Sequence, residues 1–310
     1  MESWAHPEDR QLLPVPLCGM PLLIDCTRKP ALVHGTSAGN RPPLLARDGK
    51  YPKELEPSQV RTVADLSDVL TSEDKRSLDG CLVAYWIYRG LCCPQHEHLF
   101  NQLSLRFDIT ILEPMRLGSQ FNKTYGHYHA EAAPGVTYPE VYQVLYGTAL
   151  YLLQKPVQGR PDVVSDFVAV PANQGDIVVV PPGYGHVTVN VGNGPLVMAN
   201  LVETHFLSHY APFRELAGAA YYAKLSQSSD LCDAKPSSLT LAGSLVNLAP
   251  NLRYHRIPEP RWLTPLELAR EAGLSLLLNG LVTGRNQSLY SRCCSHPELF
   301  SFLVSPHLYF

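Results

Sequence analysis

The chain has 310 residues and a mass of 34.3 kDa, enough for one large domain or for a medium domain with appendages. Its formal net charge is −3 and its pI is near 6.4, so neither nucleic acid nor a membrane surface is an expected partner. Only 17% of the residues are charged and 27 are prolines, a balance that favours strands and turns over long exposed helices.

The first 58 residues are rich in proline, and we expect an N-terminal extension there, built as a loose arm or as covering loops. Residues 60–78 then carry apolar side chains at helical spacing. Within them, Thr71 precedes Ser72-Glu73-Asp74, which suits an N-cap and an acidic first turn. One or two short helices are therefore predicted in this stretch.

From Cys81 onward the apolar pattern changes to that of strands. Candidate strands are residues 82–88, 103–111, 140–146, 149–154, 167–170, 177–180, 186–191 and 196–202. Glycines separate several of them. Many short strands at close spacing predict an antiparallel sandwich or barrel, and we assign residues 59–225 to it.

Residues 226–310 form the third predicted unit, a C-terminal extension. Thr264, Pro265 and Glu267 stand at the N-cap, first and third positions of a helix. Gly273 is a natural end for that helix, which we predict near residues 265–272.

Eight cysteines occur without a CxxC pair, and the first residues contain acids and no apolar signal core. We therefore expect a cytoplasmic protein with free, mostly buried thiols. No apolar run approaches the length of a membrane span.

Three histidines and one glutamate lie on the strand-like segments between residues 124 and 190. His127 and His129 are two residues apart, so on an extended segment both side chains point to one face. Glu140 opens the next candidate strand, and His186 follows a Pro-Pro-Gly turn. This set predicts a mononuclear metal site inside a small barrel.

The ligand types restrict the metal. Neutral imidazole and carboxylate together suit Zn, Fe, Ni, Co or Mn rather than Ca or Mg. Four protein ligands leave open positions only around a five- or six-coordinate ion. One Fe²⁺ or Mn²⁺ per subunit is therefore favoured, with Zn²⁺, Ni²⁺ and Co²⁺ as alternatives.

The residues around these ligands form particular motifs: Thr124-x-Gly-His-x-His, Glu140-Val-Tyr, and Pro181-Pro followed by His186-x-Thr-Val-Asn. Over about residues 80 to 222, the chain resembles the cupin-type, metal-dependent glucose-6-phosphate isomerases. The resemblance implies an all-β cupin fold, a double-stranded β-helix or jelly-roll barrel. Short flanking helices and extended N- and C-terminal segments would surround it.

The resemblance also implies a function. Family members interconvert glucose 6-phosphate and fructose 6-phosphate in glycolysis and gluconeogenesis, so the partners would be a small phosphosugar and a second subunit in a homodimer. By matching positions, the metal ligands would be His127, His129, Glu140 and His186. The implied substrate-binding residues are Thr110, Thr124, Gly126 and Tyr210, and the implied catalytic residues are Glu140, Tyr85, Tyr142 and His209.

Two positions depart from the family pattern. Tyrosines expected near positions 183 and 202 are replaced by Gly183 and Val202. A non-catalytic sugar-phosphate-binding cupin is therefore one alternative. A cupin dioxygenase or decarboxylase is another, because one fold carries many chemistries.

Overall fold

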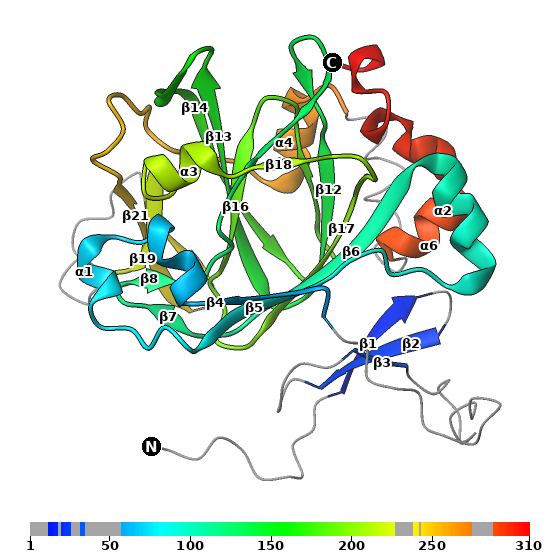
Figure 1. The fold of residues 1–310 in the computed structure, drawn as a ribbon, viewed down its shortest axis with the longest axis horizontal. Helices are drawn as coiled ribbons and strands as arrows, with labels where there is room; N and C mark the ends of the chain where they lie inside the picture. The colour runs from blue at the N-terminus through cyan, green and yellow to red at the C-terminus, as the bar shows by residue number, and fades with distance from the viewer. Residues whose placement is uncertain are drawn as a thin grey trace.

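Two facing antiparallel sheets form the centre of the computed structural model (Figure 1). The first has the order β15 (Ile177–Val180), β12 (Glu140–Tyr146), β17 (Leu196–Glu203), β6 (Leu105–Leu112), β5 (Val83–Tyr88) and β4 (Gln59–Thr62). The second contains β16 (Gly185–Asn190), β13 (Thr148–Val157) and β14 (Arg160–Asn173), with β22 (Arg261–Trp262) added in parallel. The predicted all-β cupin barrel with short helices is confirmed.

The structure describes residues 57–226, 238–241, 243–274 and 288–310, and the backbone of three N-terminal strands. These strands are β1 (Leu12–Leu17), β2 (Met20–Asp25) and β3 (Leu32–His34), and they form an antiparallel sheet of their own. Here the structure departs from the expected loose arm. Pro14 and Pro16 are compatible with a strand because β1 is an edge strand in this sheet.

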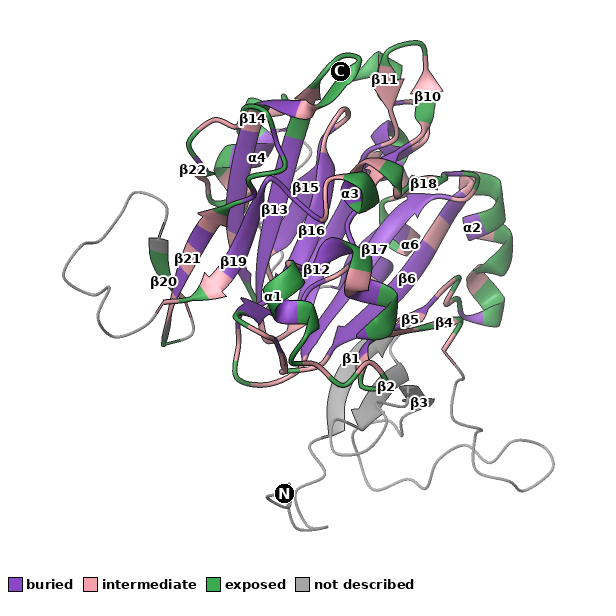
Figure 2. Ribbon diagram, turned by 60° about the vertical axis from the view of Figure 1, so that its left-hand side comes forward, coloured by how far each residue is buried: buried purple, intermediate pink, exposed green. Residues whose placement is uncertain are grey.

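The two main sheets meet through aromatic and apolar side chains. Tyr142 on β12 and Tyr151 on β13 have ring centroids 5.3 Å apart. The Tyr151 hydroxyl also lies 3.7 Å from the Met198 sulfur on β17. Strand residues on both sheets are buried along most of their length (Figure 2), so the space between the sheets is a packed core except where it opens as a pocket.

Strand β6 is buried on both faces. Phe107, Ile109 and Ile111 belong to an outer apolar cluster, whereas Asp108 and Thr110 alternate with them toward the barrel interior. The outer cluster is covered by α2 (Glu97–Leu103), α6 (Leu289–Ser295) and the 3₁₀ helix η4 (Pro297–Leu303). In Figure 1, α2 and α6 lie together beside β6.

Tyr290 on α6 connects these covering helices to the sheet. Its ring stacks on Phe100 of α2 at 5.1 Å and meets Phe107 of β6 edge-on at the same centroid distance. Its hydroxyl accepts a hydrogen bond from the Cys93 amide at 3.0 Å. The C-terminal extension therefore covers one face of the barrel.

Smaller elements surround the main sheets. The third sheet contains β7 (Arg116–Leu117), β8 (Gln120–Phe121), β19 (Tyr221–Leu225), β20 (Ser238–Leu241) and β21 (Ser244–Pro250). Two short pairs are β9 (Tyr128–His129) with β18 (Ser208–His209), and β10 (Glu131–Ala133) with β11 (Val136–Thr137). The remaining short helices are η2 (Pro94–His96), α3 (Ala211–Glu215) and η5 (Pro306–Leu308).

The helices predicted from capping signals are present. Residues 60–78 contain η1 (Ala64–Val69) and α1 (Ser72–Lys75), and the Thr71 hydroxyl accepts from the Asp74 amide at 3.2 Å. Helix α4 (Pro265–Glu271) has both halves of the capping box, because Thr264 and Glu267 bond each other's amides. Helix α2 was not predicted, since residue 103 was assigned to a strand.

The thiols only partly follow expectation. Cys81, Cys92, Cys293 and Cys294 are free, but only Cys293 is buried. Cys93 takes part in a disulfide bond, so the prediction of free thiols is wrong there. The calls on Cys18, Cys26 and Cys232 lie outside the described residues. Among the helices that the structure describes, none is both long and apolar enough to cross a membrane.

Candidate metal centre and substrate pocket

The four predicted metal ligands converge between the two main sheets. His127 directly precedes β9, His129 ends it, Glu140 is the first residue of β12, and His186 lies in β16. One ligand atom from each of them lies within 4.8 Å of every other. This group can hold a metal ion.

The backbone fixes the spacing of the histidines. The amide of His127 donates to the His186 carbonyl at 3.2 Å, and the reverse bond measures 3.0 Å. The rings of His127 and His129 lie 5.1 Å apart, whereas Tyr128 between them packs against Phe213 on the other side. The expected placement of both imidazoles on one face of an extended segment is therefore present.

Gly126 allows this segment to approach β16. Its φ is +86°, and an added Cβ would lie 2.5 Å from Val187 Cγ2 and 2.8 Å from the Phe213 ring. Both the backbone conformation and the close approach therefore require glycine.

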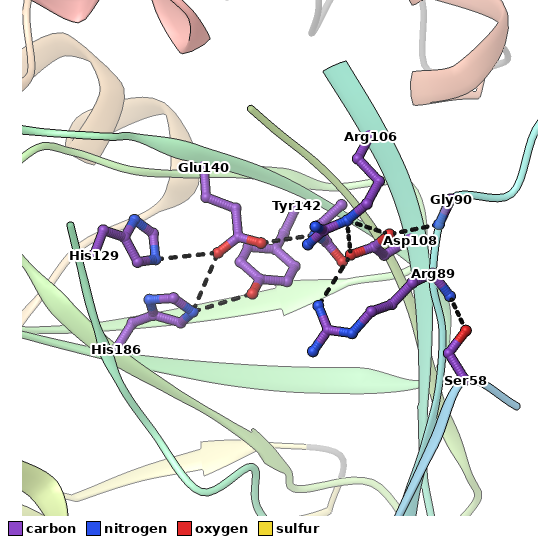
Figure 3. Close-up of polar contacts among 10 residues, drawn as sticks. Ser58, Arg89, Gly90, Arg106, Asp108, His129, Glu140, Tyr142 and His186 are labelled. Carbon is purple, nitrogen blue, oxygen red and sulfur yellow. Dashed lines mark hydrogen bonds and ion pairs between the residues drawn. The ribbon is translucent and has the colours of Figure 1, made fainter. Parts of the chain in front are cut away.

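Glu140 is oriented by a neighbouring strand (Figure 3). Asn200 on β17 donates a 2.7 Å hydrogen bond to Glu140 Oε1. The other oxygen, Oε2, lies 3.4 Å from His129 Nε2 and 3.5 Å from His186 Nε2. On the far side of its ring, His129 Nδ1 donates to the Tyr138 carbonyl at 2.6 Å, which leaves the Nε2 lone pair for a metal.

Three atoms that face the cluster lack hydrogen-bond partners within the described structure: His127 Nε2, His129 Nε2 and Glu140 Oε2. The His186 nitrogen nearest Glu140 is Nε2, which also lies 3.0 Å from the Tyr142 hydroxyl, and the unpaired nitrogen of this ring is Nδ1. Buried polar atoms are normally paired, because an unpaired one costs about 1–3 kcal/mol. A cluster of unpaired imidazole nitrogens and a carboxylate oxygen fits a divalent transition-metal ion.

The protonation states also suit metal binding. Burial lowers the pKa of His186 to about 3 and holds the pKa of His127 well below 6.5. Burial alone would raise the pKa of Glu140, but the neighbouring His129 and His186 bring it below its usual value. At neutral pH the site therefore offers neutral imidazoles at His127 and His186 and an ionised carboxylate at Glu140.

A pocket opens beside this centre. The space beside the centre measures about 550 Å³, with the open solvent at its mouth included. The predicted residues that line it are Tyr85, Thr110, Thr124, Gly126, Tyr142 and Tyr210. Tyr142 also reaches the metal centre, because its hydroxyl lies 3.0 Å from His186 Nε2.

Among the predicted catalytic and substrate-binding residues, His209 is the one that the structure does not bring into the pocket. Its side chain is exposed, and neighbouring residues Ser208 and Tyr210 line the pocket instead. His209 pairs with Tyr128 across β18 and β9, so both side chains lie on the face opposite His129.

The polar pocket residues that the sequence reasoning missed include Arg89, Arg106, Asp108 and Asn200. A signal for two of them was present, since Arg106 and Asp108 alternate with buried apolar residues along β6. That alternation was interpreted only as the mark of a strand.

The two departures from the family pattern have different surroundings. Gly183 lies in a turn with φ of +82°, and its amide donates to the Thr137 hydroxyl. Its neighbour Tyr184 donates to Asp166 at 2.6 Å and is not among the pocket-lining residues. Val202 is buried on β17, directly across from Arg106 in register.

The family model and the named relatives that match this chain all belong to one family. A family model described as "Glucose-6-phosphate isomerase (GPI)" matches residues 60–235. The chain is 34% identical over 158 residues to glucose-6-phosphate isomerase of Thermococcus gammatolerans, which covers 50% of this chain and 75% of that one. It is 36% identical over 111 residues to the Pyrococcus furiosus protein of the same name, covering 36% and 51%.

Similarity to solved structures is weaker. A vicilin from Solanum melongena aligns with a TM-score of 0.30 and 18% identity, over 40% of this chain and 30% of that one.

Proposed function

The chain belongs to the glucose-6-phosphate isomerase family, and on that premise we propose that it is a metal-dependent aldose–ketose isomerase. Its substrates are glucose 6-phosphate and fructose 6-phosphate. The observation that carries the proposal is the group of three histidines and one glutamate, with three unpaired buried atoms facing one another, beside a pocket. Chains of the same family name from Thermococcus and Pyrococcus support the substrate class.

One divalent ion, with Fe²⁺ or Mn²⁺ favoured, would be held by His127, His129, Glu140 and His186. When bound, it would supply Lewis-acid stabilisation of negative charge on the substrate oxygens. Asn200 and the Tyr138 carbonyl orient Glu140 and His129 for that role.

Tyr85 and Tyr142 serve as hydrogen-bond donors to the substrate oxygens. Burial raises the pKa of both hydroxyls above the usual 10, so they remain protonated at neutral pH. The Tyr85 hydroxyl is held by the Tyr125 amide, which donates to it at 3.3 Å. Both therefore point fixed O–H groups at the reacting end of the sugar.

Glu140 is also the base proposed to move the proton between C1 and C2. Its two roles compete, because a carboxylate bound to a divalent cation is a weaker base. Conversion in D₂O tests the proton route: the product should carry deuterium from solvent, and a deuterium-free product would assign the transfer to a hydride shift instead.

Thr110, Thr124, Gly126 and Tyr210 complete the proposed substrate pocket, and His209 is left out because its side chain faces away. A homodimer and a cytoplasmic location remain predictions from the family resemblance. Light scattering of the purified chain at micromolar concentration tests the dimer.

The test of function uses the purified, metal-loaded chain with fructose 6-phosphate, and follows glucose 6-phosphate formation. The wild type should convert it, and Glu140→Ala should not. Tight sugar-phosphate binding without conversion would identify the non-catalytic alternative. Oxygen consumption or decarboxylation, with no isomerisation, would identify the other cupin chemistries.

A further inference from the structure

Two arginines on the pocket wall carry charge that the proposed chemistry has not used. Arg106 lies on β6, two residues from Asp108, and Arg89 directly follows β5. Both line the same pocket as His127 and Glu140. Their side chains are partly exposed, at 35% for Arg89 and 21% for Arg106, so they are accessible from the pocket mouth.

Asp108 fixes both guanidinium groups (Figure 3). Arg106 donates from Nε to both carboxylate oxygens at 3.0 Å, and Arg89 Nη1 lies 3.5 Å from Oδ2. The Gly90 amide also donates to Oδ1 at 2.9 Å. Asp108 itself is only 3% exposed, so it acts as a buried support and does not compete with a ligand in the pocket.

The supported arginines keep donors to offer. In the hydrogen bonds recorded for the described residues, Arg106 uses only Nε, and both of its terminal amino groups are left over. Val202, across from Arg106 on β17, has no polar side-chain atom that could occupy them. A guanidinium held at Nε and open at its two ends is arranged to bind a tetrahedral oxyanion.

The predicted substrate-binding loop at Thr124–Gly126 uses some of its uncharged groups within the fold. The Thr124 amide donates to the Thr188 carbonyl at 2.9 Å, and its hydroxyl oxygen accepts from the Thr188 amide at 3.0 Å. The Tyr125 amide donates to the Tyr85 hydroxyl. The Thr124 hydroxyl can still donate its hydrogen, but Thr124, Tyr125 and Gly126 offer a dianion no positive charge.

Charge leads to the same assignment. Arg89, Arg106 and Asp108 together carry one net positive charge on a chain whose overall charge is −3. We propose that Arg89 and Arg106, held by Asp108, form the subsite that binds the phosphate group of the sugar substrate. This subsite rests on the proposed function for the identity of the sugar, but its binding chemistry is testable without turnover.

The test compares two ligands that differ only in the phosphate, 5-phosphoarabinonate and arabinonate, by calorimetry on the metal-loaded chain. The wild type should bind the phosphorylated ligand more tightly. Arg89→Gln and Arg106→Gln should each weaken that ligand about tenfold or more, the loss expected for one charge-assisted hydrogen bond. Neither should change the affinity for arabinonate.

Controls separate binding from folding. Arg160→Gln removes an exposed arginine paired with Asp162 outside the pocket and should change neither affinity. Arg106→Gln leaves Asp108 with fewer partners, so thermal unfolding is measured for each variant. Arg89→Gln keeps both Arg106–Asp108 bonds and gives the second, independent reading.

The outcomes are distinct. The subsite would be overturned if the variants lost equal affinity for both ligands, or lost none for the phosphorylated ligand. It would also be overturned if the wild type did not prefer the phosphorylated ligand. If the selective loss is found in a chain without isomerase activity, the subsite stands and the proposed function fails. If the chain isomerises fructose 6-phosphate but Arg89→Gln and Arg106→Gln leave its KM unchanged, the proposed function stands and the subsite fails.

Discussion

Asn200 Nδ2 donates a 2.7 Å hydrogen bond to Glu140 Oε1, across the ladder that joins β17 to β12. This bond occupies one carboxylate oxygen and turns the other toward His129 and His186. Asn200 therefore positions the carboxylate that the proposed metal site and the proposed proton transfer would both use. It was not among the residues predicted from the motifs.

Replacing Asn200 tests this positioning. Asn200→Ala should lower metal affinity by about 10–100-fold, the usual effect of removing a partner of a metal ligand. Competition with a chromogenic chelator measures it. Asn173→Ala, which removes an exposed amide bonded to Thr148, is the matched control and should bind metal like the wild type. Unchanged affinity in Asn200→Ala would contradict the role.

Gly126 and Gly135 provide a comparison of two positive-φ glycines. Both lie at φ near +80°, but only Gly126 has neighbours that an added Cβ would strike. In Gly135→Ala, only the backbone strain of an alanine at positive φ should lower the free energy of unfolding. In Gly126→Ala, the free energy of unfolding should fall by about 1–3 kcal/mol more, because the added Cβ overpacks against Val187 and Phe213. Urea unfolding measures the difference, and equal losses would contradict the close approach.

Tyr142→Phe separates hydrogen bonding from packing. Loss of the hydroxyl next to His186 should reduce kcat by about 10²–10³-fold, as for removal of an oxyanion donor, with metal content preserved. Tyr151→Phe is the matched control, because Tyr151 packs against the same ring, bonds the Met198 sulfur, and is not itself a pocket-lining residue. Similar kcat values for both variants would count against a catalytic hydroxyl.

Lys123 should make stability depend on pH. Burial lowers its pKa from 10.5 to about 7, although Asp74 acts in the opposite direction. Between these values the unfolded chain binds the proton and the folded chain does not, so stability should rise with pH from about 7 to 9. Lys123→Met should flatten that rise in urea unfolding, and exposed Lys155→Met should not. A wild-type profile flat over this range would contradict the buried neutral amine.

The sequence predicted those parts of the molecule that depend on local pattern. The strands 140–146 and 177–180 agree with β12 and β15 residue for residue, because β-branched runs ended by glycine or proline have few other solutions. The four candidate ligands could be identified from the sequence because His127 and His129 share a face on an extended segment, and Glu140 and His186 belong to later candidate strands.

The phosphate-binding arginines could not be found in the same way. Polar residues alternating along 103–111 are typical of a strand with one solvated face. In the structure, the apolar face of β6 is covered by α2 and α6, and the polar face lines the pocket. Which face meets solvent depends on where the helix at 289–295 packs, and that contact spans almost two hundred positions of chain.

The account depends most on the link between metal and isomerisation. The direct measurement strips the chain with chelator, then adds back Fe²⁺ or Mn²⁺ in steps while fructose 6-phosphate conversion is followed. We predict that activity is absent in the stripped chain and rises to a plateau at one ion per chain. Full isomerase activity in the stripped chain, or none after any divalent ion is restored, would contradict it.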